Sequence, residues 1–219
     1  AETRQPFGIL ITGVGGTGVV TLGALLGMAA HLDGKGVSVL DMTGIAQKGG
    51  AVFSHVRICD EPAALHAPRI ATGEADAIIG GDAIVSASPE ALAKMRAGRT
   101  RAALNCAATP TAEFTADPDW RFPRDQIEAA LADTIGAGNV GAIDATALAA
   151  RLMGNAIYAN LILLGFAWQR GLVPVSEAAL TRAIELNGAA VAMNLRAFRW
   201  GRRAANGALD PASIAALVP

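Results

Sequence analysis

The sequence predicts an α/β fold with three layers, α/β/α, in which a mostly parallel sheet is followed by a C-terminal helical portion. Short apolar runs alternate with helical patterns up to about residue 150, as in sheets built from β-α-β units. A glycine cluster, Gly13–Gly18, separates the first apolar run from the first helical pattern. Later patterns are helical. We therefore expect one Rossmann-like domain over 1–219, with an α/β part (6–150) and a helical part (151–219).

The first three elements form one supersecondary unit. Residues Phe7–Thr12 carry no charged side chain, which is typical of a strand buried on both faces. The helical pattern of Thr17–His31 follows and ends at Asp33-Gly34, because glycine commonly stops a helix. A second strand is expected over Val37–Asp41. Residues 7–41 thus have the length and order of a β-α-β unit.

The other elements follow from shorter signals. Ser88-Pro89 offers the preferred residues for the N-cap and first turn of a helix, and Asp144 and Thr146 do the same later. Prolines and an Asp-Pro pair predict a loop over 107–123. Further strands are expected at 52–58, 75–80, 100–105 and 139–143, further helices at 88–97, 124–135, 155–170, 177–187 and 189–204, and a short turn at 213–217.

Composition and charge exclude several classes of protein. Hydrophobic residues make up 52% and charged residues 17% of the chain, which is too apolar for a disordered protein. The net charge of −1 supplies no global attraction to nucleic acid or an anionic membrane. The uncharged stretch Gln5–Leu32 is as long as a spanning segment, but its central glycines disfavour a continuous helix. We expect a cytoplasmic protein that binds neither nucleic acid nor membrane.

The cysteines and histidines do not form a metal-binding pattern. No Cys-x-x-Cys pair occurs, and the histidines do not fall at ligand spacing. We therefore expect neither a metal ion nor an iron–sulfur cluster in this chain. The residues concerned are Cys59, Cys106, His31, His55 and His66.

The glycine cluster contains the pattern Gly-x-Gly-x-x-Gly between a predicted strand and a predicted helix. Glycines in that context let the backbone approach a phosphate, and the helix N-terminus favours an anion. Asp41 ends the second strand, where an acidic residue would bind an adenosine ribose. The alternative is a turn that only allows close helix–strand packing. The predicted nucleotide-binding residues of the loop are Gly13, Gly15, Gly16, Thr17 and Gly18.

The loop alone leaves the class of protein open. An NAD-dependent dehydrogenase would share it, but no hydride-transfer group of His, Tyr and Lys is evident, and the one tyrosine, Tyr158, lies in an apolar helical pattern. An adenylating enzyme would add a catalytic cysteine and zinc-binding cysteine pairs, which are not evident either. A stand-alone NAD(P)- or nucleotide-binding protein and a ligand-free assembly subunit stay open as alternatives.

Two glycine-rich segments together carry a resemblance to a known family. Gly13–Val20 (GVGGTGVV) and Gly44–Arg57 (GIAQKGGAVFSHVR) resemble the gamma subunit or domain of 2-oxoacid:ferredoxin oxidoreductases. Thr72–Asp76 and Asn160–Gly165 fit the same family, and segments within Asn187–Arg202 are most similar to its indolepyruvate branch. The resemblance covers most of the chain and implies a single gamma-type domain.

This resemblance implies an accessory role in the oxidative decarboxylation of an aryl-pyruvate such as indolepyruvate to acyl-CoA, with reduction of ferredoxin. Thiamine diphosphate and iron–sulfur clusters carry that chemistry. The chain lacks the Gly-Asp-Gly motif for thiamine diphosphate, since Gly81-Asp82 is followed by Ala83. Both groups are therefore expected only in partners, a thiamine diphosphate-binding and a ferredoxin-like domain or subunit. The gamma part is implied to bind coenzyme A, a co-substrate with an adenosine diphosphate part, and to contact other subunits.

A second phosphate-binding segment is predicted at Lys48, Gly49 and Gly50, where a lysine and two glycine amides follow one another; the alternative is a solvated loop. Nearby, Ser54 and His55 are expected to face opposite sides of one strand, which argues against a catalytic Ser–His pair. Arg57, expected on the side of His55, would pair with a phosphate or a structural carboxylate.

The helical part offers candidate contacts rather than catalysts. Asn155 and Asn160 are expected to form hydrogen bonds at a helix end or interface, because unpaired burial would be costly. Leu161–Trp168 is apolar around most of its circumference, which predicts either core or an interface with a partner or a second copy of the chain. A basic helix face, either solvated or contacting an acidic partner, is formed by Arg196, Arg199, Arg202 and Arg203.

Overall fold

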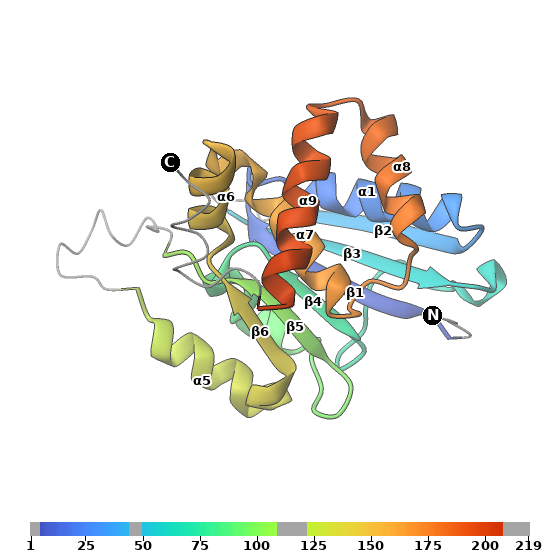
Figure 1. Cartoon of the computed structure of the whole chain (residues 1–219). Helices are drawn as coiled ribbons and strands as arrows, with labels where there is room; N and C mark the ends of the chain where they lie inside the picture. The colour runs from blue at the N-terminus through green and yellow to red at the C-terminus, as the bar shows by residue number, and fades with distance from the viewer. Residues whose placement is uncertain (1–4, 44–49, 109–121, 208–219) are drawn as a thin grey trace.

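The computed structural model describes residues 5–43, 50–108 and 122–207 and has a central sheet between two layers of helices (Figure 1). Six strands lie in the order β2-β3-β1-β4-β5-β6. Strands β1, β4, β5 and β6 are parallel, whereas β3 is antiparallel to both of its neighbours. The predicted α/β class with a mostly parallel sheet is confirmed. The strands are β1 (Phe7–Val14), β2 (Gly36–Thr43), β3 (Ala51–Cys59), β4 (Ala77–Gly80), β5 (Arg101–Asn105) and β6 (Val140–Ile143).

The sheet differs from the sequence-based expectation at β2. A β-α-β unit over residues 7–41 implied that β2 lies directly beside β1, but β3 lies between them. Strand β3 pairs with β1 along its whole length, from Phe7 opposite Ile58 to Val14 opposite Ala51. The antiparallel return of β3 keeps β1 and β2 in the same direction but places them two strand spacings, about 10 Å, apart. Strand β2 is therefore an edge strand.

Helices cover both faces of the sheet. One face packs against α1, α6, α7, α8 and α9, and the other against α2, α3 and α5. The helices that follow the neighbouring strands β1 and β4 thus lie on opposite faces, and such a switch point leaves a crevice at the carboxyl ends of the strands. The helices are α1 (Val19–Leu32), α2 (Ala83–Ser86), α3 (Pro89–Leu92), α5 (Arg124–Ile135), α6 (Ala145–Met153), α7 (Ala159–Gln169), α8 (Glu177–Asn187) and α9 (Val191–Ala205), with 3-10 turns η1 (Pro62–Ala64), η2 (Ala137–Asn139) and η3 (Ala156–Tyr158).

Several helices begin where capping residues predicted. Ser88 and Asp144 each accept a hydrogen bond from a backbone N–H in the first turn of the following helix, which satisfies a donor that the helix leaves unpaired. In the structure Ser176 does the same for α8. Asn155 does the same for η3, with Oδ1 2.9 Å from the Ile157 nitrogen. Because η3 is a separate 3-10 turn, the helix predicted from residue 155 begins only at α7.

The helix predicted over 88–97 is shorter than expected. Helix α3 ends at Leu92, and the next two carbonyls take other donors. The Ala93 oxygen accepts from the Gly73 N–H and the Lys94 oxygen from the Ala75 N–H, each at 2.9 Å. Long-range bonds thus replace the helix. The turn predicted at 213–217 and most of the 107–123 loop lie outside the described residues.

Helix α7 is buried between the sheet and α9, which confirms the core alternative for this apolar segment. Its residues Leu161–Ala167 are all buried, so this segment offers no surface for an interface. Two glycines allow α7 and α9 to touch backbone to backbone. A Cβ on Gly165 would lie 2.0 Å from the Phe198 carbonyl oxygen, and one on Gly201 would lie 1.8 Å from the Ile162 carbonyl oxygen.

The uncharged stretch Gln5–Leu32 forms β1, the glycine turn and α1, as the interrupting glycines predicted. Strand β1 is buried, whereas α1 exposes one side. Within the described ranges, no helix has the length and apolarity needed to cross a membrane.

Candidate functional site

The Gly13–Gly18 segment forms a tight turn from β1 into α1. Gly16 and Gly18 have φ angles of +86° and +84°, a left-handed conformation that strongly favours glycine. The Thr17 N–H and hydroxyl both donate to the Val14 carbonyl, at 3.1 and 2.6 Å. Gly18 is the N-cap of α1, and no described side chain caps this end. The first amides of α1 are therefore free to bind an anion.

Two glycines of the turn serve its packing. A Cβ on Gly13 would lie 2.6 Å from Cγ2 of Val19, so Gly13 lets the start of α1 lie close against β1. The Gly15 N–H donates to the Gly50 carbonyl at 3.0 Å, which joins the turn to the end of the second glycine-rich segment. Gly13 and Gly15 therefore have the packing role that the sequence offered as an alternative. Only the remaining residues of the turn are placed to contact a ligand.

Asn160 of α7, in the helical part of the chain, contacts the glycine turn. Its Nδ2 donates a hydrogen bond to the Thr17 carbonyl, and a Cβ on Gly18 would lie 2.5 Å from the same nitrogen. Glycine is therefore required at position 18 for two reasons: its φ is left-handed, and any larger residue would collide with the Asn160 side chain. The hydrogen-bonding role predicted for Asn160 is confirmed, and its partner is the candidate site itself.

A cavity of about 500 Å³ opens beside the glycine turn, a volume typical of small-molecule sites. Its walls come from the turn, the carboxyl ends of β4 and β5, the start of α6, the segment before α7 and the connection from α8 to α9. This is the crevice expected at the switch point between β1 and β4. Polar side chains in the walls include Thr17, Thr21, Asp82, Asn105, Thr146, Asn160, Asn187 and Asn194.

The structure brings together only part of the predicted site. Gly16, Thr17 and Gly18 line the cavity, whereas Gly13, Gly15 and Gly50 support the turn from behind. Asp41 is exposed on β2 and does not line the cavity. The predicted contact of Asp41 with a ribose assumed that β2 lies beside β1. Because β3 lies between these two strands, the structure does not support that contact. Lys48 and Gly49 lie outside the described residues.

Asn105 and Asp82 are cavity residues that the sequence analysis missed. Asn105 ends β5 and links three elements: its Oδ1 accepts from the Ala145 N–H at 3.0 Å, and its Nδ2 donates to Thr146 Oγ1 at 2.9 Å and to the Gly81 carbonyl at 3.3 Å. The sequence did contain a signal for both residues, since each is a polar residue at or just after the end of a predicted parallel strand. The carboxyl ends of such strands meet at one edge of the sheet, where ligands bind.

The described wall of the cavity has one charged side chain, Asp82, whose Oδ1 accepts from the Val85 N–H at 2.9 Å as the N-cap of α2. An anionic ligand would therefore be bound by backbone amides and neutral side chains rather than by a described lysine or arginine. Among residues 5–43, 50–108 and 122–207, no group of three or more His, Cys, Asp and Glu side chains is placed to hold a metal ion.

Strand β3 presents Ser54 and His55 to opposite faces of the sheet, as predicted. Ser54 faces α1, since a Cβ on Gly23 would lie 2.4 Å from its Oγ, whereas His55 lies on the opposite face and accepts from the Ile70 N–H through Nδ1 at 3.2 Å. A Ser–His pair is excluded. Arg57 donates to the Ala67 carbonyl at 2.8 Å, so its described partner is neither of the two that the sequence suggested.

His55 is a structural residue with an unusual ionisation. Its side chain is 1% exposed, and burial together with the positive charges of Lys94 and Arg69 lowers its pKa to about 4. The geometry agrees, because Nδ1 accepts a hydrogen bond and therefore carries no proton. His55 is neutral at physiological pH and lies outside the cavity.

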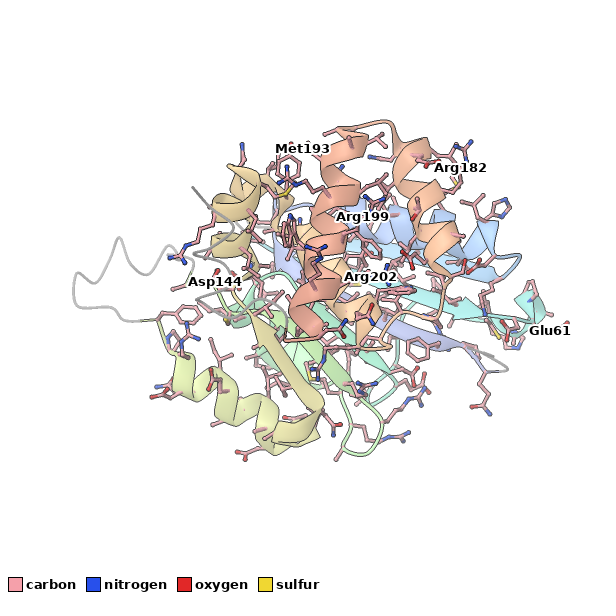
Figure 2. All side chains as sticks on the ribbon, viewed as in Figure 1. Glu61, Asp144, Arg182, Met193, Arg199 and Arg202 are labelled. Atoms are coloured by element: carbon pink, nitrogen blue, oxygen red, sulfur yellow. The ribbon has the colours of Figure 1, made fainter. Side chains whose placement is uncertain are left out.

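The basic face predicted for α9 is partly neutralised within the chain. Arg202 forms an ion pair with Glu177 of α8, donates to Gln169 Oε1 at 2.9 Å and stacks on the Trp168 ring. Figure 2 shows Arg199 and Arg202 projecting from α9. Arg199, like Arg196 and Arg203, is exposed. The face is therefore divided between an internal bridge and solvated arginines.

Comparison with known proteins agrees with the fold. The chain is 29% identical over 201 residues to indolepyruvate oxidoreductase subunit IorB of Methanothermobacter thermautotrophicus, which covers 91% of this chain and 97% of that protein. The gamma subunit of a keto/oxoacid ferredoxin oxidoreductase from Geobacter sulfurreducens superposes with a TM-score of 0.63 at 23% identity and covers 92% of this chain and 99% of that one.

A larger structure contains the same fold as one part. The 2-oxoglutarate:ferredoxin oxidoreductase of Magnetococcus marinus, solved with 2-oxoglutarate, coenzyme A and succinyl-CoA bound, matches with a TM-score of 0.67 at 20% identity, over 95% of this chain but 32% of that chain. The sequence profile of pyruvate ferredoxin/flavodoxin oxidoreductases matches residues 8–204. The match runs from β1 to α9, and this chain therefore belongs to the pyruvate ferredoxin/flavodoxin oxidoreductase family.

Proposed function

We propose that this chain is the accessory gamma subunit or domain of an indolepyruvate-type 2-oxoacid:ferredoxin oxidoreductase, and that its glycine-turn cavity holds coenzyme A, the co-substrate. Family membership and the nearly full-length relative support the accessory role. The chemistry of decarboxylation and electron transfer belongs to thiamine diphosphate and iron–sulfur clusters in partner subunits. The choice of indolepyruvate rests on the name of that relative.

The observation that carries the coenzyme A proposal is the cavity at the uncapped N-terminus of α1. Gly16 has a left-handed φ and carries no side chain, and the space beside its Cα is open, so a diphosphate can approach the backbone amides there. Thr17, Thr21 and Asn194 provide neutral polar groups around them. Coenzyme A also carries neutral amides along its pantetheine arm, and the asparagines in the wall suit such groups. The residues present therefore fit the ligand.

A melting experiment tests this ligand. A ligand at ten times its Kd stabilises the folded chain by about 1.4 kcal/mol, so coenzyme A is expected to raise the Tm and NAD and NADP are not. Thr21→Phe should abolish the shift, because Thr21 is exposed on α1 and lines the cavity. The matched control is His31→Phe, which is exposed on the same helix away from the cavity.

Gly16→Val, which the sequence motif suggests as the test, is less suitable. A Cβ on Gly16 meets nothing within 4 Å, but the φ of +86° would strain any branched residue at this position. A loss of binding by this variant could therefore not be distinguished from an effect on folding. A shift with NAD and none with coenzyme A would replace our proposal with a dehydrogenase-like one. No shift with any of the three would leave an assembly role without a ligand.

The accessory role predicts that the purified chain alone decarboxylates no 2-oxoacid. Addition of the thiamine diphosphate-binding and ferredoxin-like partners should restore reduction of ferredoxin or of a dye by indolepyruvate. The measurement is indolepyruvate-dependent dye reduction with and without partners. Turnover by this chain alone would refute the role, provided that mass spectrometry shows no copurified partner.

A further inference from the structure

A half-buried arginine without an anionic partner lies at the end of α7. Arg170 directly follows the last residue of this helix, and its buried Nε–H has no hydrogen-bond acceptor. Among the residues that the structure describes, the Arg170 guanidinium forms neither a hydrogen bond nor an ion pair. A charge removed from water is costly unless an opposite charge compensates it. The described part of the chain supplies no such charge to Arg170.

The fold holds this guanidinium in one place. A Cβ on Gly141 of β6 would lie 2.7 Å from both Cζ and Nε of Arg170, so the guanidinium packs against the backbone of the strand. Glycine inside a strand often marks a close approach of this kind. The Phe166 ring makes a second contact, with its centroid 5.4 Å from Cζ. A guanidinium fixed in this way loses little side-chain entropy when an anion binds to it.

A second arginine without a described partner lies on the same face of the sheet. Arg101 begins β5, and Ala103, two residues later and therefore on the same face, is paired with Gly141. Arg101 is exposed, and its Nη1 would lie 4.0 Å from a Cβ on Gly171, the residue after Arg170. Its side chain forms no ion pair or hydrogen bond with any described residue. We call Arg101 and Arg170 the arginine pair.

The neighbouring carboxylates bind other arginines. Glu177 of α8 pairs with Arg202, and Arg202 also donates to Gln169, which directly precedes the half-buried arginine. Asp76, whose carbonyl accepts from the first N–H of β5, pairs through its carboxylate with Arg99. The described residues therefore leave the positive charge of the arginine pair uncompensated. Strand β6 is the last strand of the described sheet, so this charge lies beside a sheet edge.

We propose that the arginine pair binds a carboxylate-bearing surface of another subunit of the enzyme, an inference that rests on the proposed accessory role. Charge decides the class of partner, because guanidinium groups match carboxylates in both charge and geometry. A second copy of this chain fits less well, since a two-fold interface centred here would place the arginine pair against its own image. Nucleic acid also fits less well, because its binding depends on many more phosphate contacts than two arginines provide.

Binding of this chain to the purified thiamine diphosphate-binding and ferredoxin-like partner subunits tests the proposal. Arg170→Met and Arg101→Met should each raise the Kd about tenfold or more, because each removes a charged hydrogen bond. Added NaCl should weaken the wild-type complex more steeply than either variant complex. Biolayer interferometry at several salt concentrations measures both effects. The matched control is Arg151→Met, at an exposed arginine in the last turn of α6, near the start of α7 rather than its end, and it should bind as wild type does.

The Tm of the free chain separates recognition of a partner from a structural role. Loss of an uncompensated charge should leave the Tm of Arg170→Met unchanged or raise it, whereas an arginine that only stabilises the fold would give a lower Tm and an unchanged Kd. If Arg170→Met folds poorly, Arg101→Met, at an exposed residue, decides the question.

Three results would overturn the proposal. Wild-type Kd values for both variants would do so and leave the accessory role intact, whereas failure of the wild-type chain to bind the partner subunits would overturn both. Inorganic phosphate that raises the Tm of wild type but not of Arg170→Met, together with an unchanged Kd for the partner subunits, would assign the arginine pair to a small anion instead.

Discussion

Replacement of Gly165 or Gly201 with alanine is expected to lower the free energy of unfolding by about 3 kcal/mol or more, enough to unfold part of the population. The added Cβ would lie 2.0 or 1.8 Å from a carbonyl oxygen of the facing helix. Backbone atoms cannot rotate away, so α7 and α9 must separate. Because α7 lies between α9 and the sheet, the separation would open the core on that face.

Gly27→Ala is the matched control, since Gly27 also lies within a helix, α1. Its added Cβ would lie 3.1 Å from Cγ2 of Val39, a side-chain methyl that is able to move. Alanine is favoured over glycine inside a helix by about 1 kcal/mol, so this variant should be neutral or slightly stabilised. Urea denaturation of the three variants provides the comparison. Wild-type stability of both Gly165→Ala and Gly201→Ala would show that the two helices do not cross as closely as described.

The fold class was predictable because its signals are local. An apolar run without charge gives a buried strand, a glycine cluster ends it, and a capping residue begins a helix. The order of the strands is not local. Nothing in Val52–Ile58 states that this segment inserts between β1 and β2, since antiparallel and parallel neighbours both accept an apolar strand. Prediction of a β-α-β unit therefore gave the correct elements and an incorrect neighbour for β2.

The candidate site shows the same division. The glycine turn was evident because its spacing and its place between strand and helix are both written in the sequence. The opposite walls were not, because Asn105 and Asn194 come from positions that only the folded chain brings to the turn. The prediction for Asp41 failed because the neighbour of β2 was predicted incorrectly. The residue type and its position on a strand suit a ribose contact, but β3 separates Asp41 from the turn.

Asn160 was noticed for a simpler reason, an amide in an otherwise apolar helix. The sequence implied that it must find a partner, because an unpaired buried amide costs about 1–3 kcal/mol. It did not identify Thr17 of the turn as that partner. The same reasoning extends to Asp76, whose carboxylate accepts from the Gly8 N–H at 2.8 Å and from Arg99 at 2.7 and 3.1 Å. Asp76 belongs to the Thr72–Asp76 segment that resembles the family, and these contacts give it a structural role beside β1 and β4.

Acidification is expected to destabilise the protein through His55. Its pKa is lowered to about 4 in the folded chain, against about 6.5 in the unfolded chain. Between these values the unfolded chain binds a proton that the folded chain does not, so the free energy of unfolding falls as the pH falls from about 6.5 to about 4. Above pH 6.5 both forms are neutral and this contribution is constant. At pH 4.5 the loss amounts to about 2 kcal/mol.

His55→Asn isolates this effect, because the amide oxygen takes the place of Nδ1 and still accepts the Ile70 N–H, but does not titrate. The variant should be less stable than wild type at pH 7, since it fills less of the core, and should lose less stability on acidification. His66→Asn, at an exposed histidine, is the control and should leave the wild-type pH dependence intact. Urea denaturation at intervals from pH 7 to pH 4.5 measures the slopes. Equal slopes for wild type and His55→Asn would mean that His55 takes up a proton in the folded chain as easily as in the unfolded one. That result would in turn require the hydrogen bond from the Ile70 N–H to His55 to open without cost, which the burial of His55 opposes.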